Sequence, residues 1–213
     1  MSRTMGMFPL STVLFPHAPL PLHVFEERYK ALMGDCMATD GVFGVVLITR
    51  GSEVGGGDQR VDVGTIARVT HLNELEDGRM LVMARGVERV RVERWLDESP
   101  YPRAQVGDLP LGRGDADAQA VAAAVAAAEQ AVRRLRSLLS ELGQVPALPH
   151  DLALDGDLEE TGWRLCDLAP LALIDRQRLL TCSGLIRQME LLCELSTAMA
   201  GDVVSLLADG GAV

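Results

Sequence analysis

Hydrophobic positions in the first 110 residues follow a pattern that is typical of β-strands. The predicted strands share short apolar runs rich in β-branched residues and lie at 8–15, 42–48, 61–75, 79–95 and 102–108. Asp77-Gly78 lies between two of these runs, which predicts a hairpin whose two turn residues both take positive φ, and Gly86 predicts a β-bulge. Apolar residues at helical spacing predict one amphipathic helix over 25–38.

Two segments of this half predict irregular structure. A proline-rich turn is expected at 16–21, and GSEVGGGDQR predicts a glycine-rich loop at 51–60. The apolar stretch from Leu14 to Leu22 leaves two alternatives: an exposed patch for unfolded chains, or a loop that lines the core.

The pattern becomes helical after the segment PLGRGDADA at 110–118. We expect helices at about 115–142, at 158–168, at 174–181 and from Ser183 onward. The first and last of these carry apolar residues at alternating spacings of four and three, which fits either a homodimer seam or packing within the chain. The pattern therefore predicts an α+β fold with a β-rich subdomain at 1–110 and an all-α helical-bundle subdomain at 111–213.

The net charge and the absence of targeting signals restrict the kinds of partner that we expect. The chain has 213 residues and a net charge of −10, of which −3 falls in residues 1–110 and −7 in the remainder. Both parts repel phosphate at long range, which disfavours nucleic acid and anionic membranes. An apolar signal region, a membrane-length apolar run and CxxC pairs are all absent from the sequence, so we expect a cytoplasmic protein with free thiols.

Catalytic motifs are missing from the sequence. Lys30 is its only lysine and follows no glycine-rich loop, which excludes a P-loop and a Ser-Lys peptidase dyad. GxSxG, HExxH and GxGxxG are also absent, and the four histidines show no metal-ligand spacing. We therefore expect no enzyme activity, no cofactor and no metal.

Two groups of residues could still form a catalytic or binding site. Cys36 with His17 or His23 would make a thiol nucleophile, or Cys36 is simply a core thiol. Arginines in the predicted hairpin would form a basic stripe that binds an acidic peptide or a phosphate. The alternative is that they form a solvated strand face and pair with glutamates. These arginines are Arg68, Arg85, Arg89, Arg91 and Arg94.

Several motifs in a fixed order resemble the Lon N-terminal, substrate-binding domain. They are Phe8-Pro9-Leu10, Val13-Leu14-Phe15-Pro16, Leu20-Pro21-Leu22, Val24-Phe25-Glu26-x-Arg28-Tyr29, Phe43-Gly44-Val45-Val46-Leu47-Ile48, Val63-Gly64-Thr65-Ile66-Ala67-Arg68-Val69 and Asp77-Gly78-Arg79 with Val82-x-x-Arg85-Gly86. The likeness is strong over 7–109 and weaker in the helices; cereblon carries a similar domain.

The resemblance implies a PUA-like, mainly antiparallel β-barrel with one helix, followed by helices. It also implies a stand-alone, non-catalytic module that binds unfolded polypeptide or a specific protein partner. A small-molecule enzyme or sensor with a pocket in the β-rich part, and an RNA-binding PUA relative, remain as alternatives. The candidate peptide-binding residues are Phe15, Pro16, His17, Pro19, Leu20, Arg68 and Arg85.

Overall fold

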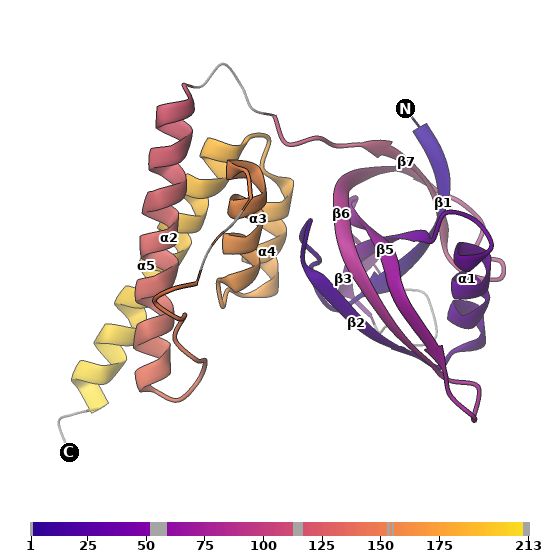
Figure 1. Cartoon of the computed structure of the whole chain (residues 1–213), viewed down its shortest axis with the longest axis horizontal. Helices are drawn as coiled ribbons and strands as arrows, with labels where there is room; N and C mark the ends of the chain where they lie inside the picture. The colour runs from indigo at the N-terminus through magenta and orange to yellow at the C-terminus, as the bar shows by residue number, and fades with distance from the viewer. Residues whose placement is uncertain (1, 52–58, 113–116, 153, 155, 211–213) are drawn as a thin grey trace. The chain divides into compact units, whose positions relative to one another are not determined.

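The chain folds as two compact units, Met1–Pro110 and Leu111–Val213. The computed structural model describes residues 2–51, 59–112, 117–152, 154 and 156–210. The first unit is a curled sheet with one helix, and the second is helical (Figure 1). The predicted α+β class is confirmed.

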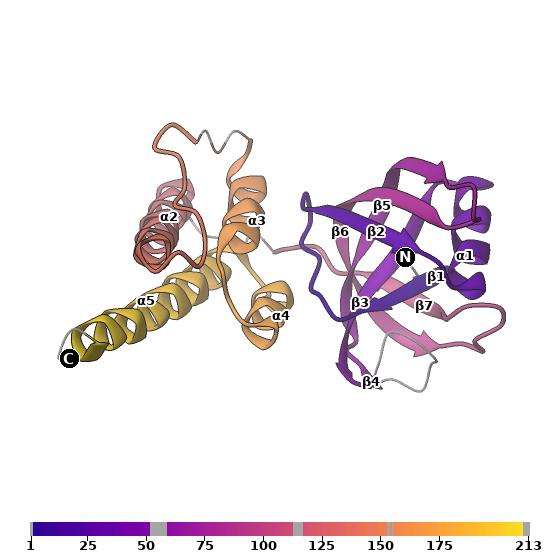
Figure 2. The same cartoon turned by 90° about the horizontal axis from the view of Figure 1, so that it is seen from below.

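Five strands close the sheet of the first unit into a ring. In ring order they are β1 (Ser2–Leu10), β7 (Arg103–Asp108), β6 (Met80–Trp95), β5 (Val63–Glu74) and β3 (Val42–Arg50). β1 closes the ring because its first residues pair antiparallel with β7 and its last residues pair parallel with β3. β2 (Pro19–Val24) pairs with β6, and β4 (Gln59–Arg60) pairs with β3 (Figure 2).

The inside of this barrel is filled by aliphatic side chains and methionines. One buried cluster joins strands from every side of the ring: Met5, Met7, Val46, Ile66, Val90, Val92, Ala104 and Val106. The helix α1 (Glu27–Met37) packs beside β1, where Tyr29 stacks on Phe8 with ring centroids 4.0 Å apart. The Phe8–Tyr29 stack thus joins α1 to the barrel wall, while this interior cluster consists of aliphatic side chains and methionines.

The β5–β6 hairpin and its bulge form where the sequence predicts them. The Gly78 N–H donates to the Leu75 carbonyl and Gly78 has φ of 76°. Asp77 is not among the described residues with positive φ, so the expectation that both turn residues adopt it was wrong. The register shifts between the pairs Ile66–Glu88 and Ala67–Gly86, which confirms a bulge next to Gly86.

The predicted strand at 8–15 and the predicted turn at 16–21 were both misplaced. β1 begins at Ser2 and ends at Leu10, and residues 19–24 form the strand β2 rather than a turn. Strand residues alternate in direction, and the Ala18 carbonyl accepts a hydrogen bond from Gly86 of β6. The backbone nitrogens of Pro19 and Pro21 therefore point away from β6. Their missing N–H groups cost no hydrogen bond of the β2–β6 ladder, which explains why prolines are tolerated in this strand.

Two other sequence predictions of the first unit need comment. The helix expected at 25–38 is α1, but Phe25 lies before it and is exposed. Of the loop expected at 51–60, residues 52–58 lie outside the described residues, and Gln59–Arg60 form β4.

The second unit contains the four predicted helices: α2 (Ala118–Glu141), α3 (Leu158–Leu168), α4 (Leu173–Thr181) and α5 (Leu185–Gly210). Capping aspartates begin two of them: the Asp117 carboxylate accepts the Gln119 N–H, and that of Asp157 accepts the N–H groups of Glu159 and Glu160. Gly143 follows α2 with φ of 69°, the left-handed conformation that often ends a helix.

The apolar faces of α2 and α5 pack on each other. Their shared cluster contains Leu135 and Leu139 from α2 and Ala200 and Val203 from α5, all buried. Leu142 and Leu206, the last apolar residues of the four-three spacing on the two helices, are exposed. The four-three spacing is thus used for packing within the chain, which was one of the two alternatives that the sequence left open.

Candidate functional site

The outer surface of strands β2, β6 and β5 combines exposed apolar side chains with cationic ones. Cross-strand pairing sets its rows: Pro19 lies opposite Arg85 and Arg85 opposite Arg68, while Pro21 lies opposite Met83 and Met83 opposite His71. We call this surface the β2–β6–β5 face. Its members are Pro19, Pro21, His23, Arg68, Thr70, His71, Asn73, Leu81, Met83 and Arg85.

Alternation along β6 explains why large apolar residues point outward here. Val82 and Ala84 are buried in the first unit, so their neighbours Leu81 and Met83 must lie on the opposite surface. Leu81 is 45 % exposed and Met83 is 41 % exposed. The Thr70 hydroxyl donates to the Met83 carbonyl at 3.0 Å, next to the register shift in β5. Two large apolar side chains side by side on one face are more informative than single exposed ones.

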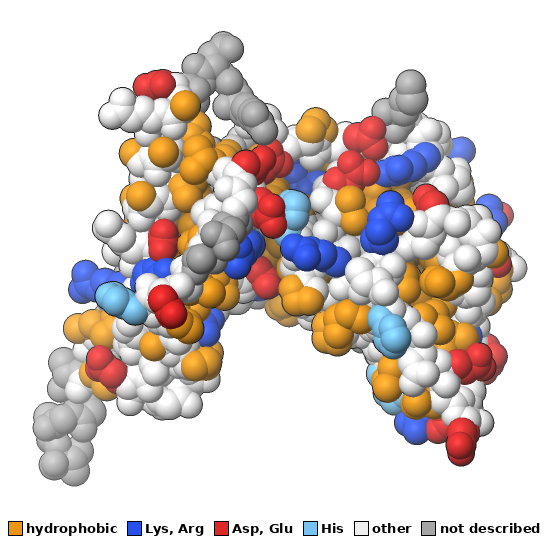
Figure 3. Space-filling model, in the orientation of Figure 1, with side chains coloured by type: hydrophobic (Ala, Val, Ile, Leu, Met, Phe, Trp, Pro, Cys, Tyr) orange, Lys and Arg blue, Asp and Glu red, His pale blue; other side chains and the backbone are white. Residues whose placement is uncertain are grey.

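One end of the face is positively charged. Arg68 and Arg85 are exposed and lie directly opposite each other, a pairing of like charges that sheets usually avoid. Arg68 is oriented by a hydrogen bond from Nη1 to the Asp40 carbonyl at 2.7 Å. The face carries no Asp or Glu at any of its ten positions, although the chain has 30 acidic residues. Figure 3 shows Arg, His and hydrophobic side chains together on the first unit.

The edge of β2 limits how a polypeptide can bind. In the described part of the chain β2 pairs only with β6, which leaves its other edge unpaired. The outward edge positions include Pro19 and Pro21, which have no N–H to donate. A peptide added to the sheet as a further strand would lack these two hydrogen bonds. The side-chain face, rather than the strand edge, is therefore the surface suited to binding.

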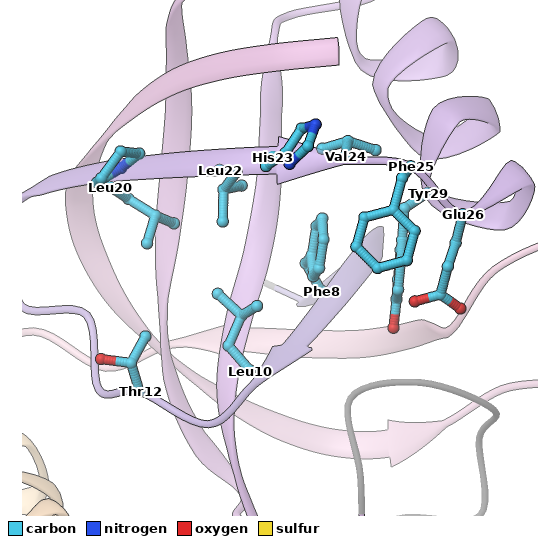
Figure 4. Close-up of a pocket in the computed structure, with 11 residues that line it drawn as sticks. Phe8, Leu10, Thr12, Leu20, Leu22, His23, Val24, Phe25, Glu26 and Tyr29 are labelled. Atoms are coloured by element: carbon cyan, nitrogen blue, oxygen red, sulfur yellow. The ribbon is translucent and has the colours of Figure 1, made fainter. Parts of the chain in front are cut away.

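On its other side β2 borders an apolar hollow of about 290 Å³. In Figure 4, Leu20 and Leu22 of β2 point toward Phe8 and Leu10 of β1, and Phe25 and Tyr29 lie at one end. Polar side chains at its rim include Glu26, whose carboxylate accepts from Arg28 at 3.0 Å. Its volume is at the lower limit for ligand pockets, which run from roughly 300 Å³ upward.

A second hollow, of about 210 Å³, lies beside α1, and Asp35, Cys36 and Tyr101 are among its lining residues. The Tyr101 hydroxyl donates to Asp35 at 2.6 Å, and burial together with this acceptor raises the pKa of Tyr101 to about 12. Burial, with Asp40 and Asp35 nearby, also raises the pKa of Cys36 to about 11. The Cys36 thiol is therefore protonated near neutral pH and donates to the Val42 carbonyl, as a core thiol does and a nucleophile does not.

The candidate residues from the sequence divide into three places. Pro19, Arg68 and Arg85 form one row of the β2–β6–β5 face, and Leu20 lines the apolar hollow. Phe15 is 0 % exposed and Pro16 is buried, so both belong to the core; the stretch from Leu14 to Leu22 is mostly a core-lining segment. His17 is half-buried with φ of 65°.

The sequence reasoning missed the apolar members of the face. Leu81, Met83 and Arg85 alternate with Val82, Ala84 and Gly86, a period-two pattern that indicates two differently exposed surfaces. Both surfaces of this strand carry apolar residues, with Leu81 and Met83 on one and Val82 and Ala84 on the other. The pattern therefore does not reveal which surface is exposed. The cross-strand partners Pro21 and His71 depend on a register that no local pattern specifies.

The predicted arginine stripe is not continuous. Arg89 is 4 % exposed, because the bulge beside Gly86 reverses the alternation and turns this side chain inward. Arg91 and Arg94 are exposed farther along β6, where Arg94 contacts Gln105. Glu88, which lies between Arg85 and Arg89, pairs with Arg3 at 2.6 Å. Only Arg68 and Arg85 remain together on one face.

Metal-binding and membrane-spanning features are both missing from the described residues. No group of three or more His, Cys, Asp or Glu side chains lies in position to hold a metal ion within the described ranges. None of the helices, as far as the structure describes them, combines the length and apolar character that crossing a membrane requires.

Comparison with known proteins identifies the family. The family model of the ATP-dependent protease La (LON) substrate-binding domain matches residues 4–197. Lon protease 2 of Herpetosiphon aurantiacus is 30 % identical over 175 residues, which cover 80 % of this chain and 21 % of that protein. Lon protease of Xanthomonas oryzae pv. oryzae is 30 % identical over 193 residues, covering 86 % of this chain and 21 % of that protein.

Solved structures agree. The crystal structure of a Lon N-terminal domain protein from Xanthomonas campestris aligns with a TM-score of 0.62 at 27 % identity, over 89 % of this chain and 96 % of that one. The N-terminal domain of a Mycobacterium avium complex Lon protease shares the fold, with a TM-score of 0.62 at 12 % identity over 92 % and 98 % of the two chains. The chain spans about a fifth of the length of the curated Lon proteases named above. The match over nearly the whole chain shows that it belongs to the LON substrate-binding domain family.

Proposed function

We propose that this chain is a non-catalytic protein-binding module that captures extended, apolar segments of unfolded polypeptides on the β2–β6–β5 face. The observation that carries the proposal is the outward position of Leu81 and Met83, beside Pro21, on strands whose opposite surface is core. The family match supports a binding role, because it covers the substrate-binding domain.

The physical basis is the removal of apolar surface from water. Covering Leu81 or Met83 contributes roughly 25 cal/mol to the free energy of binding for each Å² of apolar area that is buried. A thioether adapts its shape to different partners, so Met83 suits a surface that must accept many sequences. The side-chain face also avoids the donor-poor edge of β2, so binding does not require a fixed strand register.

The proposal is tested by fluorescence anisotropy with a labelled, extended apolar peptide. We expect the double variant Leu81→Thr/Met83→Thr to bind about tenfold more weakly than the unaltered chain, since burying such side chains contributes on the order of 1–2 kcal/mol. Val204→Thr is the matched control, because Val204 is 44 % exposed on α5. Equal affinity of the double variant and the control would contradict the proposal.

The apolar hollow supports a second candidate, a small-ligand sensor. Phe8, Leu10, Leu20 and Leu22 enclose an apolar volume between β1 and β2. Leu22→Trp would fill this volume without altering the β2–β6–β5 face, since Leu22 points to the opposite side of β2. A small ligand whose thermal stabilisation of the protein disappears in this variant, while peptide binding persists, would favour the sensor.

A further inference from the structure

We infer that the apolar hollow between β1 and β2 is a binding site for a small, neutral aromatic molecule, with Phe25 as one of its walls. Such a site lies outside polypeptide capture on the β2–β6–β5 face and does not depend on it. It gives the small-ligand candidate a definite chemical class. The size of the hollow, its charges and its aromatic side chains each point to this class.

The volume of the hollow sets the size of its ligand. It measures about 290 Å³, whereas a cavity of roughly 150 Å³ lined by Leu, Ile and Phe is large enough to hold benzene. The hollow therefore suits one or two fused rings. Leu20 and Leu22 point into it from the side of β2 that is opposite the β2–β6–β5 face (Figure 4). A polypeptide held on that face thus leaves the hollow open to a second, smaller molecule.

The charges around the hollow are paired with each other. Among the described residues that line it, Glu26 is the only one with a carboxylate, ammonium or guanidinium group. The Arg28 Nε donates to this carboxylate at 3.0 Å, and the Arg28 guanidinium also lies 4.5 Å from the centroid of the Tyr29 ring. A charged ligand would lose water without gaining an opposite charge, and a neutral ligand avoids that cost.

Aromatic side chains gather at one end of the hollow. Phe8 and Tyr29 stack there, and Phe25 lies at the same end (Figure 4). The His23 ring meets the Phe25 ring edge-on, with centroids 6.2 Å apart. Aromatic rings attract one another in offset and edge-on arrangements beyond the gain from apolar burial, so this end favours an aromatic ligand over an aliphatic one.

The exposure of Phe25 is the second observation that points to a ligand. The other three phenylalanines of the chain are at most 6 % exposed, but Phe25 is 53 % exposed. It follows Val24, the last paired residue of β2, and precedes α1, so neither element buries it. A ring bound in the hollow would cover part of Phe25 and remove that apolar area from water.

The first test uses three fluorinated probes that differ in charge. 5-Fluoroindole is neutral, 5-fluoroindole-2-carboxylate is an anion and 5-fluorotryptamine is a cation near neutral pH. Each is titrated with the whole chain, and the broadening of its fluorine NMR line gives a dissociation constant. We expect the neutral probe to bind at least about tenfold more tightly than either charged one, because burial of an unpaired charge is costly.

A second pair of probes separates aromatic from merely apolar binding. Fluorobenzene and fluorocyclohexane are similar in size, and we expect fluorobenzene to bind about threefold more tightly because it adds ring–ring contacts. In Phe25→Leu, which keeps an apolar side chain without the ring, this preference should fall toward one. A purely structural role of Phe25 would weaken both probes equally and would contradict its place as an aromatic wall.

Variants assign the binding to the hollow. Leu22→Trp fills it and should abolish the broadening of 5-fluoroindole. Val204→Thr, an exposed position on α5, is the matched control and should leave the dissociation constant unchanged. Circular dichroism melting verifies that each variant is folded, and Phe25→Leu provides an independent readout if Leu22→Trp does not fold.

The outcomes separate this site from polypeptide capture. If 5-fluoroindole does not bind, or binds Leu22→Trp as it binds the unaltered chain, the site is overturned, while peptide binding through Leu81 and Met83 is untouched. If the charged probes bind as tightly as the neutral one, the ligand class is wrong. Loss of probe binding in Leu81→Thr/Met83→Thr would place the probe on the β2–β6–β5 face and would also overturn the assignment.

Discussion

The helical unit and the β-rich unit differ in whether their apolar sequence patterns are buried within the chain or exposed. On α2 and α5 the four-three repeats suggest a seam for a partner, yet Leu135, Leu139 and Val203 are buried against each other. On β6, Leu81 and Met83 belong to an ordinary strand pattern, yet both are outside. An apolar pattern therefore indicates an interaction, but only the packing shows whether its partner is the same chain.

Breaking the helical side of this comparison should have the largest effect. Leu135→Ala removes a fully buried side chain between α2 and α5, and we expect the free energy of unfolding to fall by about 3 kcal/mol. Leu142→Ala alters the exposed end of the same repeat and should change it by less than about 0.5 kcal/mol. Urea denaturation measures both; equal effects would mean that the repeat is not used for internal packing.

The β-rich unit is tightly packed where β6 meets the segment before β2. A Cβ at Gly86 would collide with the Phe15 carbonyl, which is backbone and cannot turn away. We therefore expect Gly86→Ala to lower the free energy of unfolding by about 2 to 3 kcal/mol. Gly34→Ala is the control, since a Cβ there meets nothing within 4 Å in α1, and it should stabilise by about 0.5 kcal/mol or more.

Alkaline pH should weaken the β-rich unit through its buried thiol. Burial raises the pKa of Cys36 from 9.0 to about 11, so the folded state favours the protonated form. The resulting stability is complete below pH 9 and is lost as pH rises toward 11, a change on the order of 2 kcal/mol. Urea denaturation from pH 8 to 11 should show a shallower decline in Cys36→Ala, and an unchanged slope would contradict this assignment.

The smallest expected effect on stability is at the proposed binding face. Met83→Thr replaces a partly exposed side chain by a β-branched one, so we expect a change in unfolding free energy within about 0.5 kcal/mol. The same variant should weaken peptide binding measurably. A loss of stability comparable to that of Leu135→Ala would show that Met83 is core and would remove the contrast between the two units.

Much of the local structure was predictable because it depends on neighbours in sequence. Helical spacing located α2, and the Asp-Gly turn located the β5–β6 hairpin. The errors arose where a distant strand decided the outcome. Residues 19–24 form a strand because β6 supplies the pairing partner. The prediction of a turn relied on the local proline content alone.

The family resemblance also came from the sequence, because several motifs in a fixed order are specific even when each is weak. The candidate site did not follow in the same way. Arg68 and Arg85 were named for their charge, but Phe15 and Pro16 were named for their apolar character and are buried. Side-chain chemistry states what a residue can bind, whereas its exposure depends on which elements pack over it.

The sequence by itself determined the class of fold, the family and the kinds of element, because periodicity and turn chemistry are local properties. The tertiary structure alone decided that Pro19, Arg85 and Arg68 share one row, that Pro21 and Met83 lie beside them, and that Arg89 turns inward. These facts follow from strand register and one bulge. A shift of a single residue in register reverses which side chains face the solvent, so the binding face is set by non-local pairing.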